Sequence, residues 1–91
     1  MTRIVIAEDQ GLLRGALASL LRLEDGIEIA GEAADGQQAW DMVRRETPDV
    51  LVTDIEMPGM TGLELAGAIR RAELPVKVLI VTTWARPGYL R

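Results

Sequence analysis

The sequence lacks cysteine and histidine altogether, and it has only three aromatic residues among its 91. Without these side chains, disulfide bonds, thiol chemistry, zinc sites built on thiolate or imidazole ligands, and histidine general bases are excluded for this chain. Any metal ion that it binds must therefore be a hard cation held by oxygen ligands.

Long apolar runs and an excess of positive charge are lacking too. No stretch is long enough to cross a bilayer, and the acidic pair Glu8-Asp9 comes too early for a signal peptide. The formal net charge of −4 is unfavourable for direct binding of nucleic acid or anionic lipid. We therefore expect one globular, cytoplasmic domain with no membrane association.

Four short apolar runs, at residues 3–7, 27–31, 49–53 and 76–82, alternate with three stretches of helical periodicity. This alternation predicts parallel βαβ units with right-handed crossovers, and hence a doubly wound α/β sheet. The run at 27–31 alternates polar and apolar residues, which suits an edge strand, whereas the other three are nearly continuously apolar. The predicted strand order is therefore 2-1-3-4. The apolar helical positions are Leu13, Ala16, Leu17 and Leu20; Gly36, Ala39, Trp40 and Val43; and Gly62, Leu65, Ala66 and Ile69.

Two of these helical stretches open with a capping pattern. Thr61 with Glu64 forms a capping box, in which each side chain satisfies a free backbone donor of the first turn. Asp35 with Gln38 repeats that pattern before the second helical stretch.

Polar side chains follow three neighbouring strands at the same edge of the predicted sheet. The first strand ends in Glu8-Asp9, the third in Asp54 and the fourth in Thr82-Thr83. Ligands of open parallel sheets bind outside the carboxyl ends of the strands. Each acid alone would be an ordinary cap or loop residue, but their convergence predicts a site.

Three carboxylates at such close range repel one another unless a divalent cation binds between them. Mg²⁺ fits, because it prefers a few carboxylate oxygens together with water and phosphate. Asp9 and Asp54 are the predicted direct ligands, Glu8 a direct or water-mediated one, and the backbone carbonyl of Glu56 a further one. A carboxylate can then attack phosphorus to form an acyl phosphate, with the Thr82 hydroxyl donating to a phosphoryl oxygen.

The segments "IAEDQ", "TDIEMPGMTGLEL" and "VLIVTT" resemble the receiver domain of two-component response regulators, and the likeness extends over residues 1–91. "LLRLEDGIEIAGEAADGQQA" and "TTWARPGYLR" are similar to the NarL/FixJ class and, within it, to DesR-type regulators. The resemblance implies a flavodoxin-like fold and a switch protein that is not a turnover enzyme. It also implies transcription regulation through a DNA-binding output domain that these 91 residues do not include.

The resemblance also implies roles for single residues. Asp54 would accept phosphate from a sensor histidine kinase, with Mg²⁺ held by Glu8 and Asp9. Thr82 would be the switch hydroxyl that moves toward the phosphate, and the small Thr83 would leave the pocket open. Homodimerisation would follow phosphorylation.

One departure from the family pattern concerns the end of the fold. Its fifth strand, which carries a lysine, and its fifth helix have no counterpart here, and Lys77 precedes the fourth strand. We therefore expect residues 1–91 to be a receiver domain truncated at its C-terminal end, with an exposed apolar edge and poor stability as a monomer.

Leu12, Leu21 and Leu23 lie outside the apolar stripe of the first helix. Burial under the absent helix and a docking surface for a kinase or second receiver explain them equally well.

Two alternative functions compete with the receiver hypothesis. A haloacid-dehalogenase-like phosphatase also uses a strand-end aspartate with Mg²⁺, and Asp54-x-Glu56 resembles its two-acid motif, although such enzymes usually place the nucleophile after the first strand. A pseudo-receiver that binds partners without taking phosphate is the other alternative.

Overall fold

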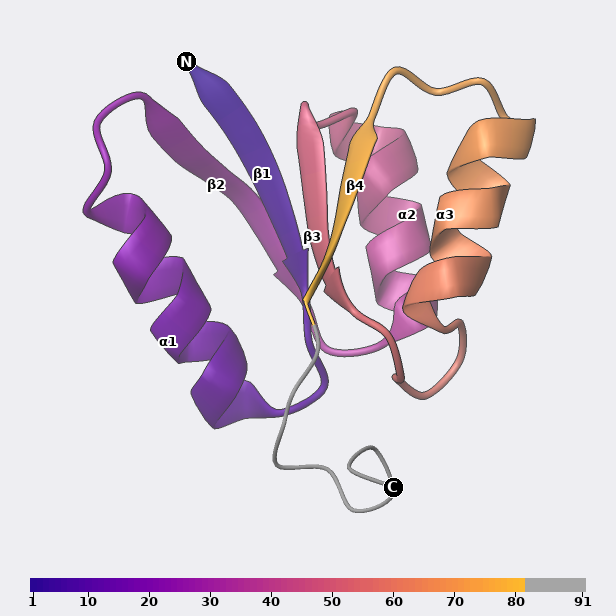
Figure 1. Ribbon diagram of the computed structural model, residues 1–91, viewed down its shortest axis with the longest axis horizontal. Coiled ribbons are helices and arrows are strands. Elements are labelled where there is room, and N and C mark those ends of the chain that lie inside the picture. Colours follow the sequence, from indigo (N-terminus) through magenta and orange to yellow (C-terminus); the bar gives the residue numbers. More distant parts are fainter. Residues whose placement is uncertain (82–91) are drawn as a thin grey trace.

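The computed structural model describes residues 1–81, which form a four-stranded parallel sheet flanked by three helices (Figure 1). The strands are β1 (Thr2–Ala7), β2 (Ile27–Ala33), β3 (Val50–Asp54) and β4 (Lys77–Val81). Their order in the sheet is β2-β1-β3-β4, and every neighbouring pair is parallel. The predicted doubly wound, flavodoxin-like order is therefore confirmed, and β2 runs two residues further than predicted.

The three helices cover the two faces of the sheet unequally. They are α1 (Gly11–Arg22), α2 (Gly36–Glu46) and α3 (Gly62–Arg71). Figure 1 shows α2 and α3 together on one face and α1 on the other. Successive strand residues alternate between the faces. Val5 and Leu51 belong to the core on the side of α2 and α3, whereas Ile6 belongs to the core on the side of α1.

The predicted apolar stripe of α1 is partly wrong. Ala18 is the buried residue of this helix, and Leu17 and Leu21 pack beside it against the strands. Leu21, which the periodicity placed outside the stripe, therefore faces the sheet. Ala16 and Leu20, which the periodicity placed inward, are exposed, and Leu20 retains 63% of its accessible surface. The cause is that α1 is apolar over a wide arc, so helical spacing alone does not fix which leucines face the sheet.

Several large apolar side chains remain exposed on the described part of the chain. Leu12 of α1 and Leu23, the residue that caps the end of this helix, are 91% and 79% exposed, as expected of residues outside the stripe. Leu79 of β4 is 56% exposed, and no strand of residues 1–81 pairs with the outer side of β4. The face of the sheet under α1 is thus only partly covered by residues 1–81.

The helix starts follow the predicted caps. Thr61 and Glu64 form the reciprocal capping box, with hydrogen bonds of 3.1 and 2.9 Å. At α2, Asp35 accepts from the backbone N–H of Gln38 at 2.8 Å, but Gln38 accepts in return from Ala34 rather than from Asp35. Trp40, predicted to lie in the core, is half-buried against it.

The amino ends of the strands are tied together through Arg3. Its guanidinium donates to the backbone carbonyl of Glu46 at 2.7 Å and to the Glu46 carboxylate at 3.0 Å, at the end of α2. It also lies 3.4 Å from the Glu28 carboxylate on β2. The backbone N–H of Arg3 donates to the Asp49 carboxylate before β3, and Lys77 at the start of β4 donates to the Asp49 carbonyl. This end of the sheet is therefore cross-linked by hydrogen bonds from β2 to β4.

None of the helices within residues 1–81 has the length and apolar character that crossing a membrane requires.

Candidate functional site

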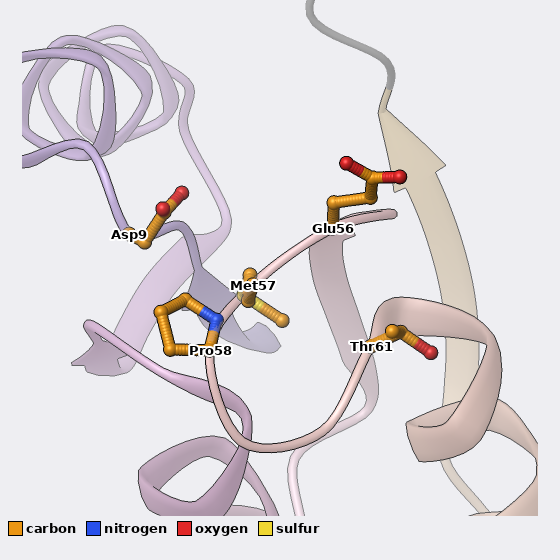
Figure 2. A pocket seen from close by; sticks show the side chains of 5 residues that line it. All are labelled: Asp9, Glu56, Met57, Pro58 and Thr61. Atoms are coloured by element: carbon orange, nitrogen blue, oxygen red, sulfur yellow. The ribbon is translucent and has the colours of Figure 1, made fainter.

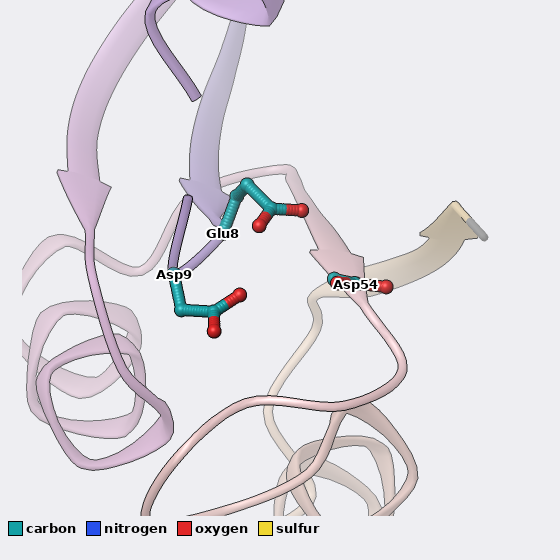
Figure 3. A group of neighbouring side chains, drawn as sticks. All are labelled: Glu8, Asp9 and Asp54. Carbon is teal, nitrogen blue, oxygen red and sulfur yellow. The ribbon is translucent and has the colours of Figure 1, made fainter. Parts of the chain in front are cut away.

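The predicted acidic residues meet at the carboxyl ends of β1 and β3. Glu8 and Asp9 follow β1 directly, and Asp54 is the last residue of β3. The two strands are parallel neighbours in which Ala7 pairs with Thr53, so their carboxyl ends lie side by side. Figure 3 shows the three carboxyl groups gathered there. One carboxylate oxygen from each residue lies within 4.8 Å of the other two, so the predicted proximity is observed.

Two of the three acids are almost completely buried. Glu8 is 2% and Asp54 3% exposed, whereas Asp9 is half-buried. Each of the two buried carboxylates accepts a backbone hydrogen bond of 2.8 Å, Glu8 from Gln10 and Asp54 from Ile55. Such bonds to N–H groups at the start of the following loop fix the orientation of both carboxylates.

The environment of Glu8 raises the pKa of its carboxyl group to about 7. Burial is the largest cause; a hydrogen bond with Asp9 and the negative charges of Asp54 and Asp9 add to it, while the hydrogen bond from Gln10 acts in the opposite direction. Repulsion among the acids, predicted from the sequence, thus contributes, but desolvation contributes more. A bound cation would remove this bias toward the protonated form.

The loop between β3 and α3 forms the other wall of the site. A hollow of about 370 Å³ is lined by Asp9, Glu56, Met57, Pro58 and Thr61. Figure 2 shows Asp9 on one side and the loop that carries the other four residues beside it. Because Asp9 belongs both to this hollow and to the carboxylate group, the hollow opens directly beside the acids.

Two glycines that helical spacing places in apolar stripes also hold this loop in place. Gly36, at the start of α2, donates its backbone N–H to the carbonyl of Pro58 at 2.9 Å. Gly62 donates to the carbonyl of Ile55 at 2.6 Å. A Cβ at Gly36 would overlap the backbone of Met60. In the sequence, both contacts are indicated by a glycine at the first helical position, because glycine permits close approach of a neighbouring backbone.

Thr82, Thr83 and the segment that follows lie outside the described residues. The register nevertheless pairs Asp54 with Val81, the residue before Thr82 in the sequence. Glu56 is exposed and lies in the loop that directly follows Asp54.

Comparison with known proteins identifies the family. Residues 4–90 match the response regulator receiver domain. The chain belongs to the response regulator receiver family. This receiver domain is 52% identical over 91 residues to the transcriptional regulatory protein DesR of Bacillus subtilis, covering 100% of this chain and 45% of that protein. The chain thus spans less than half the length of this relative.

Solved structures agree with the assignment. A LuxR-family DNA-binding response regulator from Staphylococcus aureus has a TM-score of 0.88 and 46% identity, with 99% of this chain and 75% of that one covered. The signal receiver domain of the putative response regulator NarL from Mycobacterium tuberculosis has a TM-score of 0.89 and 36% identity, with coverage of 96% and 70%. The family assignment favours two-component signalling over the phosphatase hypothesis.

The donor set suits the metal that receiver domains bind in an acidic pocket of this kind. An octahedral Mg²⁺ ion places its ligand oxygens no more than about 4.2 Å apart. The observed limit of 4.8 Å is slightly larger, so small side-chain rotations would bring the three carboxylates within range.

Proposed function

We propose that this receiver domain accepts a phosphoryl group on Asp54 from the phosphohistidine of a sensor histidine kinase, and thereby controls a DNA-binding output domain. The observation that carries the proposal is the meeting of Glu8, Asp9 and Asp54 within 4.8 Å at the carboxyl ends of two adjacent strands. Mg²⁺ would be held by these three carboxylates and by the backbone carbonyl of Glu56.

Asp54 is the nucleophile in this proposal. Its Oδ1 accepts from the backbone N–H of Ile55, which leaves the carboxylate in a fixed orientation at the strand end. An oxygen of Asp54 forms the new P–O bond while the P–N bond to the histidine breaks and the imidazole leaves. The cation supplies charge neutralisation, without which the negative phosphoryl group would be repelled by the three acids. The kinase side chain would enter through the hollow beside Asp9.

The response to phosphorylation is a change of conformation rather than turnover of a substrate. Phosphorylation adds negative charge and three strong acceptor oxygens where β3 ends. Thr82 would donate its hydroxyl to one of them, and Thr83 would leave the approach open; the pairing of Asp54 with Val81 supports this. Homodimerisation and DNA binding by the output domain would follow.

Acetyl phosphate provides a direct test. The natural full-length protein is incubated with acetyl phosphate and Mg²⁺, and the adduct is measured by intact mass with and without a chelator. We expect one phosphoryl group per chain, lost in Asp54→Asn and retained in the matched control Asp41→Asn, which alters an exposed acid on α2.

The other outcomes separate the competing hypotheses. Rapid release of phosphate without an accumulating adduct would favour a phosphatase. Neither adduct nor release, with protein that binds its partners, would favour a pseudo-receiver.

A further inference from the structure

The start of α1 is built in an unusual way. The N-cap residue Gln10 makes no side-chain capping hydrogen bond, and the first turn contains no acidic residue. The helix carries Arg14 at its fourth position instead, where the positive end of the helix dipole disfavours a cation. A cation in that position needs a compensating partner.

The partner of Arg14 is the turn that bears the acidic pair. Its Nη1 donates to the backbone carbonyl of Glu8 at 2.8 Å, and the side chain is only 24% exposed. Its Nε approaches the Glu32 carboxylate at 3.9 Å, at the end of β2. Side chains in a helix point toward its amino end, which is why Arg14 reaches back past Gln10.

The carbonyl that Arg14 holds belongs to the peptide group joining Glu8 to Asp9. Holding this carbonyl restricts ψ of Glu8 and φ of Asp9, and so limits the backbone movements that would shift the two carboxylates relative to each other. On the other side of Glu8, its N–H donates to the carbonyl of Ala33 at 3.0 Å. The turn is thus held by a β2 backbone carbonyl before Glu8 and by the Arg14 guanidinium after it.

We propose that Arg14 is a positioning residue of the cation site: its hydrogen bond to the Glu8 carbonyl fixes the direction in which Glu8 and Asp9 present their carboxylates to Mg²⁺. This inference rests on the proposed function. It assigns to α1 a part in the site, although no residue of this helix is a ligand.

Arg22 provides a matched control within the same helix. Its Nη2 lies 3.3 Å from the Glu32 carboxylate, so it shares the acidic partner of Arg14. Its ion pair is with Glu32 alone among the acids of residues 1–81, whereas the contact with the Glu8 carbonyl belongs to Arg14. Replacing Arg22 therefore removes one ion pair with Glu32 and one positive charge, as replacing Arg14 does. It leaves the proposed positioning contact with the Glu8 carbonyl intact.

Two effects of Arg14 on cation binding have opposite signs, which makes the experiment decisive. As a positive charge it repels Mg²⁺, so its removal would tighten binding. As a positioning group it orders the ligands, so its removal would weaken binding, by roughly tenfold if it resembles other groups that orient metal ligands.

The test measures Mg²⁺ dissociation constants of the full-length protein by amide chemical-shift titration, together with thermal unfolding without Mg²⁺. The variants are Arg14→Gln, Arg14→Lys and Arg22→Gln. We expect roughly tenfold weaker binding for Arg14→Gln, intermediate binding for Arg14→Lys, whose ammonium keeps the charge and a donor, and unchanged binding for Arg22→Gln.

Several results would overturn the proposal. Equal or tighter Mg²⁺ binding by Arg14→Gln would do so, even with lower thermal stability, because Arg14 would then be merely structural or repulsive. Equal weakening in Arg22→Gln would assign the effect to Glu32 and the fold. If Arg14→Gln does not fold, the comparison of Arg14→Lys with wild type decides. Failure of the wild-type protein to bind Mg²⁺ would instead refute the proposed function and the inference together.

Discussion

Glu8 combines near-complete burial with a position beside two other acids, and its pKa is raised to about 7. The pKa of a glutamate in the unfolded chain is about 4.3. At pH values between these two pKa values, Glu8 is therefore protonated in the folded Mg²⁺-free protein and ionised in the unfolded chain. Its contribution to stability is fully present below pH 4 and is lost as the pH rises through about 7.

We predict from this that Glu8→Gln flattens the pH dependence of unfolding in the absence of divalent cations. The wild-type protein should lose up to about 3 kcal/mol relative to the variant between pH 4 and pH 8. Urea unfolding at a series of pH values, with a chelator present, measures the difference. Parallel curves for the two proteins would show that Glu8 titrates normally. In the wild-type protein, Mg²⁺ should bind more tightly as the pH rises through the same interval, because the cation competes with the proton.

The loop from β3 to α3 depends on the close contact of α2 with its backbone. Gly36→Ala would place a Cβ against the backbone of Met60, so the loop or the helix must move. We predict a loss of about 1–3 kcal/mol in the free energy of unfolding, as for other overpacked contacts. Weaker Mg²⁺ binding should accompany it, because Glu56 lies in this loop. Thermal unfolding and Mg²⁺ titration measure both effects.

Gly15→Ala is the matched control for that substitution. A Cβ at Gly15 meets no atom within 4 Å, and the residue is exposed within α1. Alanine should therefore raise stability by roughly 0.5–1 kcal/mol. If Gly36→Ala were equally stabilising, the close contact would be refuted.

The capping box of α3 makes a smaller, local contribution. Thr61→Ala removes the acceptor of the Glu64 backbone N–H and should cost about 1 kcal/mol of stability. Thr61→Ser retains the hydroxyl and should restore most of it. Denaturant unfolding of the two variants measures the difference. Both variants lose the methyl group of Thr61, so an equal loss of stability in the two would indicate packing, whereas a loss only in Thr61→Ala indicates the cap.

The elements that could be predicted from the sequence were those fixed by local pattern. Strand order followed from apolar runs, and the meeting of Glu8, Asp9 and Asp54 followed from parallel topology. The inward face of α1 could not be predicted, because leucines surround the helix and only packing against the strands selects Leu17 and Leu21. The contacts of Arg14 and Gly36 were likewise not predicted, since both are made with backbone carbonyl groups, which every residue carries and no side-chain pattern marks.

The uneven covering of the sheet governs how the described part of the chain should behave in solution. On the α1 side, Leu79 is 56% exposed beside the outer edge of β4. Exposed strand edges with apolar side chains promote pairing with another chain. We predict that a polypeptide limited to residues 1–91 self-associates, and that Leu79→Lys reduces this association. Sedimentation velocity over a range of concentrations measures it.

Leu63→Lys serves as the control for this prediction. Leu63 is 63% exposed, but it lies at the start of α3 on the opposite face. Its replacement adds the same charge and should leave self-association unchanged. A monodisperse 91-residue monomer with a cooperative thermal transition would contradict the prediction outright.

The cross-linking around Arg3 has a consequence for the direction of motion. At their amino ends the strands are joined to one another and to the end of α2, whereas the carboxylates gather at the opposite ends. A rearrangement set off at Asp54 therefore meets resistance if it travels back along the strands, and much less if it spreads through the loops that leave the sheet near the acids. The amino ends of the strands should therefore keep their positions. We expect amide hydrogen exchange there to be the same with and without phosphorylation.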